Sequence, residues 1–436
     1  MTLVHPGNAA DTGDTADYDR MMDDQFDADH DLSDDPYHAF WQARPILTHI
    51  RDYARAQRVS PWSVLAVVCI RASCATRPDV RLPALIGGPA SLNLFAAIVG
   101  ESGSGKGASD AAAMDAVEFV DQWGHPVTTE VLPIGSGEGI ARTFRPADDP
   151  EDAPEVSAAI FSVPEVDTLA ALGGRSGATI MPVLRQVYSG ETIGFANSGK
   201  DTRLVVDRHT YRAGLIVGVQ PLKAGALLDD ADGGTPQRFG WFPVIDPYAP
   251  ATRPDRPEPI KVELAAFGAQ HEMQVPEVAR ETIDAHRLAT LRGEDVDPLE
   301  GHALLCRLKF AAALAVMDGR AHVNADDWEL SDSMMEVSRA ARAMCADRIA
   351  EKSRAANRAR AHADAERAEL IADRQDGRLD RRARDAILRY LDRNGPSPRK
   401  PLRGSLRSDL RGRFDAVLSE LIETGQVTQS GEVYRT

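Results

Sequence analysis

The spacing of apolar side chains changes several times along the chain, and each spacing predicts a different kind of element. Between residues 36 and 77 they recur every three or four positions, which is the spacing of an amphipathic helix. Ser60-Pro61 fits a helix start, because a hydroxyl can cap the first turn and proline suits its first position. Leu92–Val99 is almost wholly apolar, as is typical of a strand buried on both faces of a parallel sheet. We therefore expect two or three helices over residues 37–90, before a first buried strand.

Apolar β-type runs then alternate with helical stretches over residues 91–250. The runs are Val127–Ile134, Ala158–Val163, Arg203–Val206 and Gly214–Val219, and a helix is predicted over Ala108–Val120. This alternation predicts an α/β domain with a largely parallel sheet. A proline-rich stretch at 247–259 is a credible linker to a helical, lid-like region at 260–345 and a solvated helical linker at 346–378.

The last residues, 379–436, have the pattern of a winged helix. Apolar positions predict helices over Asp380–Leu391, Leu402–Leu410 and Phe414–Ile422, and a hairpin follows over Val427–Tyr434. Three helices and a hairpin in so short a segment are typical of that fold. Some winged helices bind DNA, and others bind a protein partner.

Composition gives a two- to three-domain, soluble, cytoplasmic protein. The chain has 436 residues, of which 43% are hydrophobic and 27% charged, both ordinary for globular proteins. The longest uncharged apolar run, Trp62–Ile70, is about half of a membrane span, and no signal peptide is visible. Four cysteines in a chain of this length predict neither a disulfide framework nor a zinc site.

The net charge of −16 hides two opposed ends. Residues 1–36 contain eleven aspartates and one arginine, and we expect this acidic tail to be disordered, either as a solubilising tail or as an acidic mimic competing for a basic groove. Residues 378–413 contain twelve arginines or lysines and four aspartates. A basic C-terminal end predicts contact with nucleic acid.

A glycine-rich loop follows the first buried strand directly. Residues 100–107 read Gly-Glu-Ser-Gly-Ser-Gly-Lys-Gly, which is G-x-x-x-x-G-K between a strand and a helix. Such a loop cradles phosphates with its backbone N–H groups, and Lys106 would reach the β- and γ-oxygens of ATP. The predicted nucleotide-binding residues are Gly100, Ser102, Gly103, Ser104, Gly105, Lys106, Gly107, Ala108 and Ser109. The serine or threonine that usually ligates Mg²⁺ after the lysine is replaced by Gly107, which makes Mg²⁺-assisted hydrolysis less secure.

A P-loop ATPase also needs an acid at the end of a neighbouring strand. Pro164-Glu165 ends the run Ala158–Val163, so Glu165 is predicted to polarise the attacking water and Asp167 to assist the metal. Glu138, after the run Val127–Ile134, is a rival for the catalytic acid.

Two further residues are candidates for sensing the γ-phosphate. Gln220 ends the apolar run Gly214–Val219, where an amide can report the loss of the phosphate, although it also fits a simple turn before proline. Arg238 lies in a glycine-rich loop and could meet the γ-phosphate of a neighbouring subunit, or make an ordinary ion pair. In the basic tail, the predicted phosphate contacts to DNA are Arg399, Lys400, Arg403, Arg407, Arg411 and Arg413.

Over residues 37–345 these motifs together resemble P-loop proteins of actinobacterial phages and mobile elements, described as primase–helicase-like or replication-initiator proteins. The residues that carry the resemblance are Ser60-Pro61, Gly100–Gly107, Gly135–Gly139, Val163–Asp167, Gly218–Pro221 and Gln237–Phe239. The resemblance implies a RecA/AAA+-like ATPase core that assembles as a homo-oligomeric ring such as a hexamer and moves on or melts DNA. It also implies that Arg238 acts in trans. No zinc or acidic polymerase signature of a primase is present in the sequence, so priming would come from a separate protein.

The first hypothesis is an ATP- and Mg²⁺-dependent DNA helicase or origin-melting initiator of a phage or mobile element. The alternative is a nucleotide-gated DNA-binding regulator or assembly protein with little or no turnover, because Gly107 and Pro164 depart from the usual ATPase pattern. A DNA-packaging motor is less well supported, since the clustered carboxylates of a nuclease are missing from the sequence.

Overall fold

A computed structural model describes residues 35–145, 156–174, 179–195, 204–230, 233–297 and 300–436. The chain divides into two compact units, residues 1–350 and 351–436. The predicted disordered tail lies outside the described residues except for its last two positions.

Three helices precede the main sheet, as the apolar spacing predicts. They are α2 (His38–Gln42), α3 (Pro45–Ala56) and α4 (Pro61–Cys74). Helix α4 begins at Pro61, but the Ser60 hydroxyl makes no capping hydrogen bond. Almost every residue of α4 is buried, because this helix packs against α3, α5, α11 and the sheet.

A five-stranded parallel sheet forms the centre of the first unit, in the order β10-β3-β9-β6-β5. Its strands are β3 (Leu94–Val99), β5 (Glu130–Pro133), β6 (Ala158–Val163), β9 (Arg212–Val219) and β10 (Phe239–Pro243). The mixed α/β prediction is therefore confirmed. Val99 pairs with Val219 and Val163 with Val217, so the carboxyl ends of β3, β9 and β6 meet at one edge.

Several strand predictions are wrong in detail. The predicted helix Ala108–Val120 ends at Ala116, because Val117–Val120 forms β4 and pairs with β11 (Ile260–Glu263) in a region predicted to be helical. The predicted strand at 203–206 is β8 (Leu204–Val206), which pairs antiparallel with β7 (Ile193–Phe195) outside the main sheet. Strand β10 is not among the predicted strands. A short antiparallel pair, β1 (Arg81–Leu82) and β2 (Ala90–Ser91), precedes β3.

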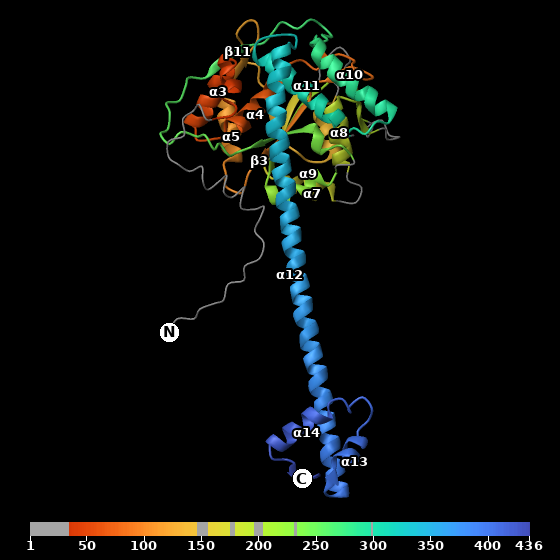
Figure 1. Cartoon of the computed structure of the whole chain (residues 1–436). Helices are drawn as coiled ribbons and strands as arrows, with labels where there is room; N and C mark the ends of the chain where they lie inside the picture. The colour runs from red at the N-terminus through yellow and green to blue at the C-terminus, as the bar shows by residue number, and fades with distance from the viewer. Residues whose placement is uncertain (1–34, 146–155, 175–178, 196–203, 231–232, 298–299) are drawn as a thin grey trace. The chain divides into compact units, whose positions relative to one another are not determined.

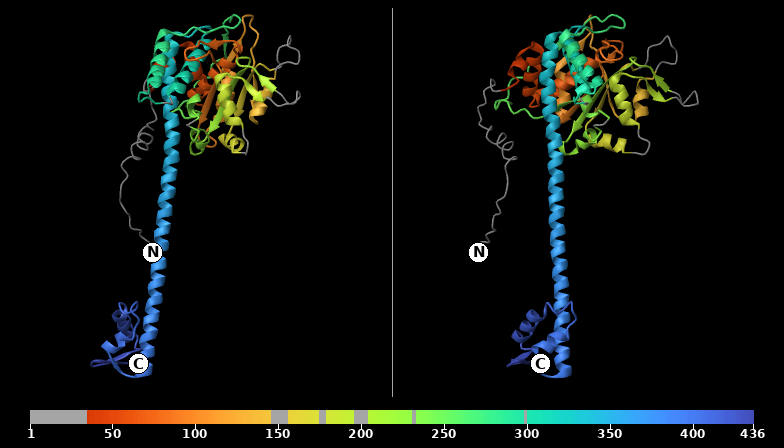
Figure 2. Two further views of the ribbon diagram at one scale, coloured as in Figure 1. Left: turned by 90° about the vertical axis from the view of Figure 1, so that its right-hand side faces the viewer. Right: turned by 45° about the vertical axis from the view of Figure 1, so that its right-hand side comes forward.

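Helices cover both faces of the sheet (Figures 1 and 2). One face packs with α3, α4, α5 (Lys106–Ala116) and α11 (Glu300–Met317). The other face packs with α6 (Gly137–Thr143), α7 (Val166–Gly173), α8 (Ile180–Ser189) and α9 (Gly225–Leu228). Alternate residues of β3, β6, β9 and β10 supply the two cores, as expected for strands buried on both sides, whereas the edge strand β5 is largely exposed.

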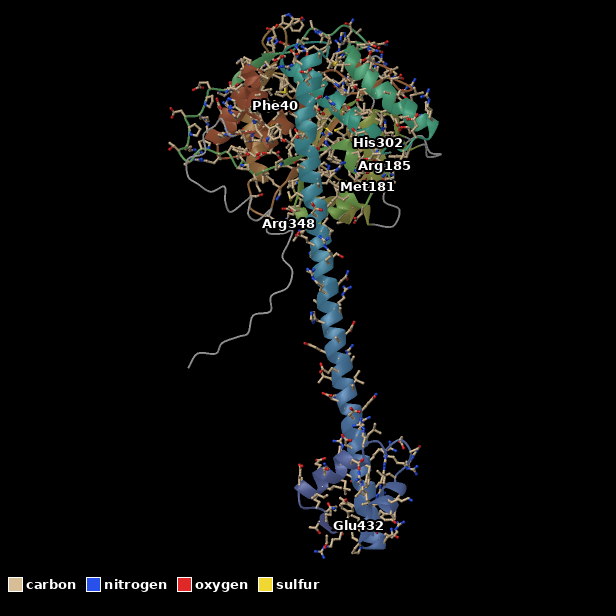
Figure 3. The ribbon with its side chains drawn as sticks, in the orientation of Figure 1. Phe40, Met181, Arg185, His302, Arg348 and Glu432 are labelled. Carbon is tan, nitrogen blue, oxygen red and sulfur yellow. The ribbon has the colours of Figure 1, made fainter. Side chains whose placement is uncertain are left out.

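The β10 edge of the sheet is closed by a helix. Helix α12 (Ala325–Asn394) contributes Ser338, whose Oγ accepts a hydrogen bond from the Trp241 N–H at 2.8 Å. Covering the strand edge in this way satisfies a backbone donor that has no partner strand. Arg348 marks the last turns of α12 that belong to the first unit (Figure 3). Helix α10 (Glu277–Arg292) lies before α11.

The second unit contains the end of α12, β12 (Ser397–Pro398), α13 (Arg399–Gly404), α14 (Phe414–Glu423), β13 (Thr428–Ser430) and β14 (Val433–Arg435). The three strands form an antiparallel sheet in the order β12-β14-β13. The third predicted helix and the hairpin are found, but the second helix covers 399–404 instead of 402–410. Leu406 and Leu410 are nevertheless buried in the same core as Phe414.

Candidate functional site

The predicted site residues of the sheet gather at the carboxyl ends of its strands. Gly100 follows β3, Gln220 follows β9, and Pro164-Glu165 follows β6. Because these strands are parallel neighbours in the order β3-β9-β6, their ends lie on one edge of the sheet. This edge is where open α/β sheets bind ligands.

The glycine loop, residues 100–105, depends on glycine at specific positions. Gly103 and Gly105 have φ of 79° and 95°, backbone conformations that other residues adopt only with strain. Gly100 continues the ladder by donating its N–H to the Val219 carbonyl at 2.9 Å. A Cβ at position 100 would lie 2.2 Å from Val244, so this glycine permits close contact with the chain after β10.

Lys106 opens helix α5 and turns back over the glycine loop. Its Nζ donates to the Gly100 and Glu101 carbonyl oxygens, each at 2.9 Å. Its stem lies above Gly218 of β9, where an added Cβ would stand 3.4 Å from Lys106 Cε and 2.1 Å from the Pro164 carbonyl oxygen. Gly218 is thus the residue that lets the ends of three elements approach one another.

Gly218→Ala is therefore expected to destabilise the protein by about 1–3 kcal/mol, because the backbone carbonyl it would meet cannot rotate away. Urea unfolding measures the change. Gly107→Ala is the matched control, since a Cβ there meets nothing within 4 Å, and it is expected to cause no loss of stability. Equal stability of the two variants would contradict the close approach at Gly218.

Glu165 and Gln220 meet across β6 and β9. The Gln220 side-chain amide donates to Glu165 Oε2 at 2.8 Å, and both side chains are only partly buried. Glu165 occupies the position just before α7. The structure thus brings together the predicted catalytic acid and the predicted sensor amide, on neighbouring strand ends.

The other two carboxylates are engaged elsewhere. Asp167 is exposed and forms an ion pair with Lys223, and its assignment to the metal stays a prediction. Glu138 accepts a hydrogen bond from the Thr179 hydroxyl at 2.9 Å. Its own backbone N–H and that hydroxyl hold the pKa of Glu138 below its ordinary value, which makes it a poorer proton acceptor.

The hydroxyls near the loop divide into two groups. Ser102 and Ser104 are exposed, and Ser104 Oγ donates to the Glu101 carbonyl at 2.7 Å. Ser109 is fully buried and accepts a hydrogen bond from Ser63 of α4, so it does not line the site as predicted. The helical positions 107 and 108 are exposed at the first turn of α5, where backbone N–H groups lack partners within the helix.

Arg238 lies away from these residues. It directly precedes β10, at the opposite edge of the sheet from the glycine loop. Its Nη1 donates to the Gly233 carbonyl at 2.7 Å, and its side chain is partly buried. Arg238 therefore cannot meet a phosphate held by its own glycine loop, and its trans-acting role stays a prediction.

A cavity of about 300 Å³ lies at the end of β10, and the sequence did not predict it. Pro243 and Ile245, on either side of the Val244 that contacts Gly100, belong to its wall. The aromatic rings of Tyr37 and Trp62 also line it, with their centroids 5.1 Å apart. Its walls come from α2, α3, α4, α12 and the chain after β10, which are distant in sequence. The one local signal in the sequence is the group of aromatic residues near residue 40.

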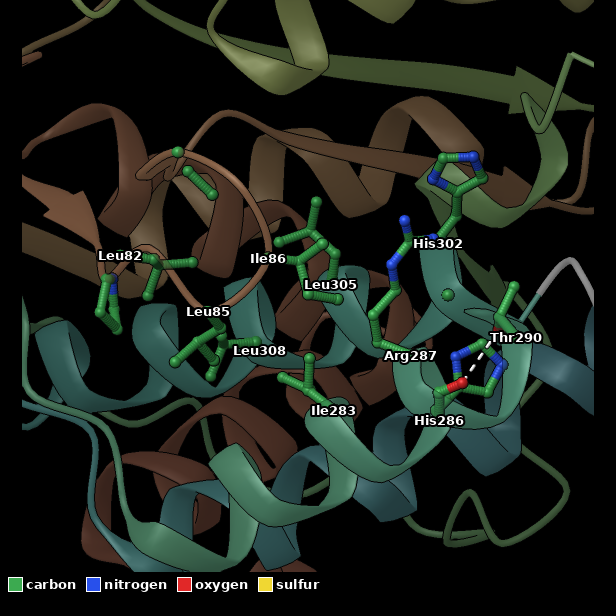
Figure 4. A pocket seen from close by; sticks show the side chains of 14 residues that line it. Leu82, Leu85, Ile86, Ile283, His286, Arg287, Thr290, His302, Leu305 and Leu308 are labelled. Atoms are coloured by element: carbon green, nitrogen blue, oxygen red, sulfur yellow. Dashed lines mark hydrogen bonds between the residues drawn. The ribbon is translucent and has the colours of Figure 1, made fainter. Parts of the chain in front are cut away.

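A second cavity of about 350 Å³ lies between the β1–β2 connection and helices α10 and α11 (Figure 4). Leucine and isoleucine side chains line one end, and His286, Arg287 and His302 lie at the other. Burial, and then the nearby charge of Arg238, lower the pKa of His302 to about 4.

This depressed pKa predicts a pH dependence. The unfolded chain binds a proton at His302 near pH 6.5 and the folded chain only near pH 4, so stability is lost as pH falls between these values. His302→Asn is expected to flatten this part of the stability curve, measured by urea unfolding at a series of pH values. Parallel curves for the two proteins would contradict it.

The six predicted DNA contacts separate into two groups. Arg399, Lys400, Arg403 and Arg411 line one hollow in the second unit. Arg407 Nε lies 3.6 Å from Asp409, and Arg413 pairs with Asp376 and Asp380 of α12. Arg413, which directly precedes α14, therefore forms ion pairs with α12 and does not point toward the hollow lined by the other four cations.

Within the described ranges, no group of three or more histidine, cysteine, aspartate or glutamate side chains could hold a metal ion by itself. None of the helices in those ranges is long and apolar enough to cross a membrane. A comparison of the sequence with models of known protein families found no match, and a comparison with curated proteins found none either.

Proposed function

We propose that the protein is a P-loop ATPase that couples ATP hydrolysis to DNA strand opening, as a helicase or an origin-melting initiator of a phage or mobile element. The observation that carries the ATPase is the Gln220–Glu165 hydrogen bond of 2.8 Å beside Lys106 and the glycine loop. A phosphate-binding lysine, a carboxylate and an amide on adjacent strand ends are among the parts that P-loop NTPases use for γ-phosphate hydrolysis.

The same geometry supports one orientation of the proposed nucleotide. Its γ-phosphate would lie toward Glu165 and Gln220, on the β9 side of β3. The base would then extend to the other side of β3, into the cavity lined by Tyr37 and Trp62. An aromatic wall suits a purine, because base–aromatic stacking contributes about 1–3 kcal/mol.

In this reaction Lys106 would leave the Gly100 and Glu101 carbonyls for the β- and γ-oxygens. The Gln220 amide, which donates to Glu165 without nucleotide, would turn to the γ-phosphate, and the released Glu165 carboxylate would accept the proton of the attacking water. Loss of that phosphate would return Gln220 to Glu165. This return links hydrolysis to the chain after β9.

The residues present fit a magnesium ion with few protein ligands. Mg²⁺ keeps several waters and commonly uses one or two carboxylates together with substrate phosphates. Glu165 is the carboxylate that could hold it through a bound water, which would leave the carboxylate free to act as the base, since Asp167 is paired with Lys223. When bound, the ion would neutralise charge that develops on the phosphate oxygens.

The DNA part of the proposal is supported by the second unit. Its helices and three-stranded sheet follow the order of a winged helix, and four cations line its hollow. A homo-oligomeric ring remains part of the proposal, with Arg238 as the residue that would act between subunits.

Strand opening is tested with a fluorescently labelled DNA duplex carrying a single-stranded end. We expect ATP-dependent strand separation by the full chain, and none with a non-hydrolysable ATP analogue or with the Glu165→Gln variant. Equal strand separation with and without hydrolysis would contradict the coupling.

A second candidate is a nucleotide-gated DNA-binding protein with little turnover. It is favoured by the missing hydroxyl at Gly107 and by the Asp167–Lys223 ion pair. Both features reduce the ligands available to Mg²⁺.

Gly107→Ser separates the two candidates. A side chain at position 107 has open space, and serine is about 0.5 kcal/mol better than glycine in a helix, so folding is expected to be preserved. If wild-type turnover is negligible and rises in Gly107→Ser, the regulator is favoured. If the wild type already hydrolyses ATP and the variant changes the rate little, the ATPase is favoured. Steady-state phosphate release at several Mg²⁺ concentrations measures both, with Gly107→Ala as the control.

A further inference from the structure

We infer that the second unit binds the phosphate backbone of DNA through the α13 hollow, defined by Arg399, Lys400, Arg403 and Arg411, and that α14 stays out of the DNA groove. The inference rests on the proposed action on DNA and specifies how this unit contacts it. It means that the unit holds DNA without reading its base sequence.

The α13 hollow concentrates positive charge on a shaped surface. It encloses about 570 Å³ between the start of α13 and the turn that follows it. Arg411 is held in place by donating to the Leu406 carbonyl at 3.0 Å and the Gly404 carbonyl at 3.3 Å, and Arg399 is held by Asp415. Lys400 and Arg403 are exposed and have no ion pair within the described residues, so both are free to bind phosphate oxygens.

Helix α14 has the opposite charge. Its sequence over Phe414–Glu423 contains three exposed carboxylates and neither lysine nor arginine; Asp415 pairs with Arg399 and Glu420 with Arg384, and Glu423 has no ion pair within the described residues. Arg413, which directly precedes the helix in sequence, pairs with Asp376 and Asp380. A helix in the major groove lies between two rows of phosphates; α14 offers them no cation of its own, and Glu423 would be repelled there.

These two surfaces decide the kind of binding. Cations that contact phosphates fix position without carrying sequence information, whereas base edges are read by side chains inserted in a groove. The α13 hollow therefore supplies phosphate contacts, and α14, which has no lysine or arginine, supplies no base contacts. We expect the affinity to be similar for duplexes of unrelated sequence and to fall steeply with salt.

The test measures binding of the full chain to three labelled duplexes of unrelated sequence, by fluorescence anisotropy over a range of salt concentrations. In the double variant Lys400→Ala/Arg403→Ala we expect the slope of log affinity against log salt to become shallower by about 1.8, equally for all sequences. At 0.1 M salt this corresponds to a loss of about tenfold for each contact removed. Arg360→Ala, on an exposed part of α12, is the matched control and is expected to leave the slope nearly unchanged.

Helix α14 is tested through Ser419, which is exposed in its middle. Ser419→Glu adds a negative charge there, with Ser419→Ala as the neutral control and circular dichroism to confirm folding. We expect both to bind DNA within about twofold of the wild type. Loss of binding in Ser419→Glu alone, an unchanged Lys400→Ala/Arg403→Ala variant, or strong preference for one duplex would overturn the inference.

Failure of the inference can be told apart from failure of the proposed function. Duplex binding that depends on α14, with ATP turnover intact, would overturn the inference alone. Binding that depends on the α13 hollow, in a chain that does not hydrolyse ATP, would overturn the proposed ATPase and leave the inference standing.

Discussion

Replacing Glu165 by glutamine is expected to lower ATP turnover by about 100-fold or more while ATP binding persists. A positioned general base commonly contributes a factor of this size, and glutamine cannot accept the proton of the attacking water. Glutamine has nearly the shape of glutamate, and its side-chain oxygen can still accept the hydrogen bond from Gln220 that spans 2.8 Å in the wild type. The substitution therefore removes the proton acceptor and is expected to preserve the hydrogen bond with Gln220.

Turnover is measured as phosphate release, and binding is measured separately with a fluorescent ATP analogue. Asp167→Asn is the matched control, two residues farther along, and is expected to change turnover by less than about threefold because Lys223 already occupies that carboxylate. Glu138→Gln tests the rival acid in the same assay. A large loss in either control, with Glu165→Gln fully active, would show that the catalytic acid has been misassigned.

Lys106→Ala is expected to weaken ATP binding by about 10- to 100-fold, which corresponds to the roughly 1.5–3 kcal/mol of a hydrogen bond to a charged group. Its Nζ rests on two loop carbonyls in this structure, so moving to a phosphate requires no rearrangement of the backbone. Turnover is expected to fall to background. Isothermal titration with ATP and Mg²⁺ measures the affinity.

Lys223→Ala is the control for general loss of positive charge at this edge of the sheet. It removes the partner of Asp167 and is expected to leave ATP affinity within about threefold of the wild type. Equal affinities for the wild type and Lys106→Ala would exclude the glycine loop as the phosphate site.

The parts of the site that the sequence predicted are those with a local signature. A buried strand, a glycine loop and a helix stand next to one another in the chain, so Lys106 could be placed from spacing alone. Glu165 and Gln220 each follow an apolar strand of a parallel sheet, and parallel strands bring their carboxyl ends to one edge. Their hydrogen bond follows from β6 and β9 being neighbours, which the alternation of elements does not specify.

The missed parts depend on contacts between distant segments. Val117–Val120 extended the helical pattern of α5, but pairing with Ile260–Glu263 makes it a strand. The cavity at the end of β10 is lined by residues of α2, α3, α4 and α12, which are distant in sequence. Closeness to Lys106 in sequence predicts Ser109 in the site, whereas the turn of α5 directs its side chain to Ser63 in the core.

The charges of the second unit show the same limit. Six cations close together in sequence predict a single DNA-binding surface. In the structure, Arg413 is separated from the others because Asp376 and Asp380 of α12 pair with it. Charge density in a sequence indicates the kind of ligand, and folding decides which cations remain free to contact it.

The most direct test of the account is the steady-state rate of ATP hydrolysis by the full chain with Mg²⁺, with and without single-stranded DNA, beside Lys106→Ala. The account predicts turnover that rises when DNA is added and falls to background in the variant. Tight binding of ATP and Mg²⁺ with no turnover under either condition would contradict it and would favour the nucleotide-gated DNA-binding protein.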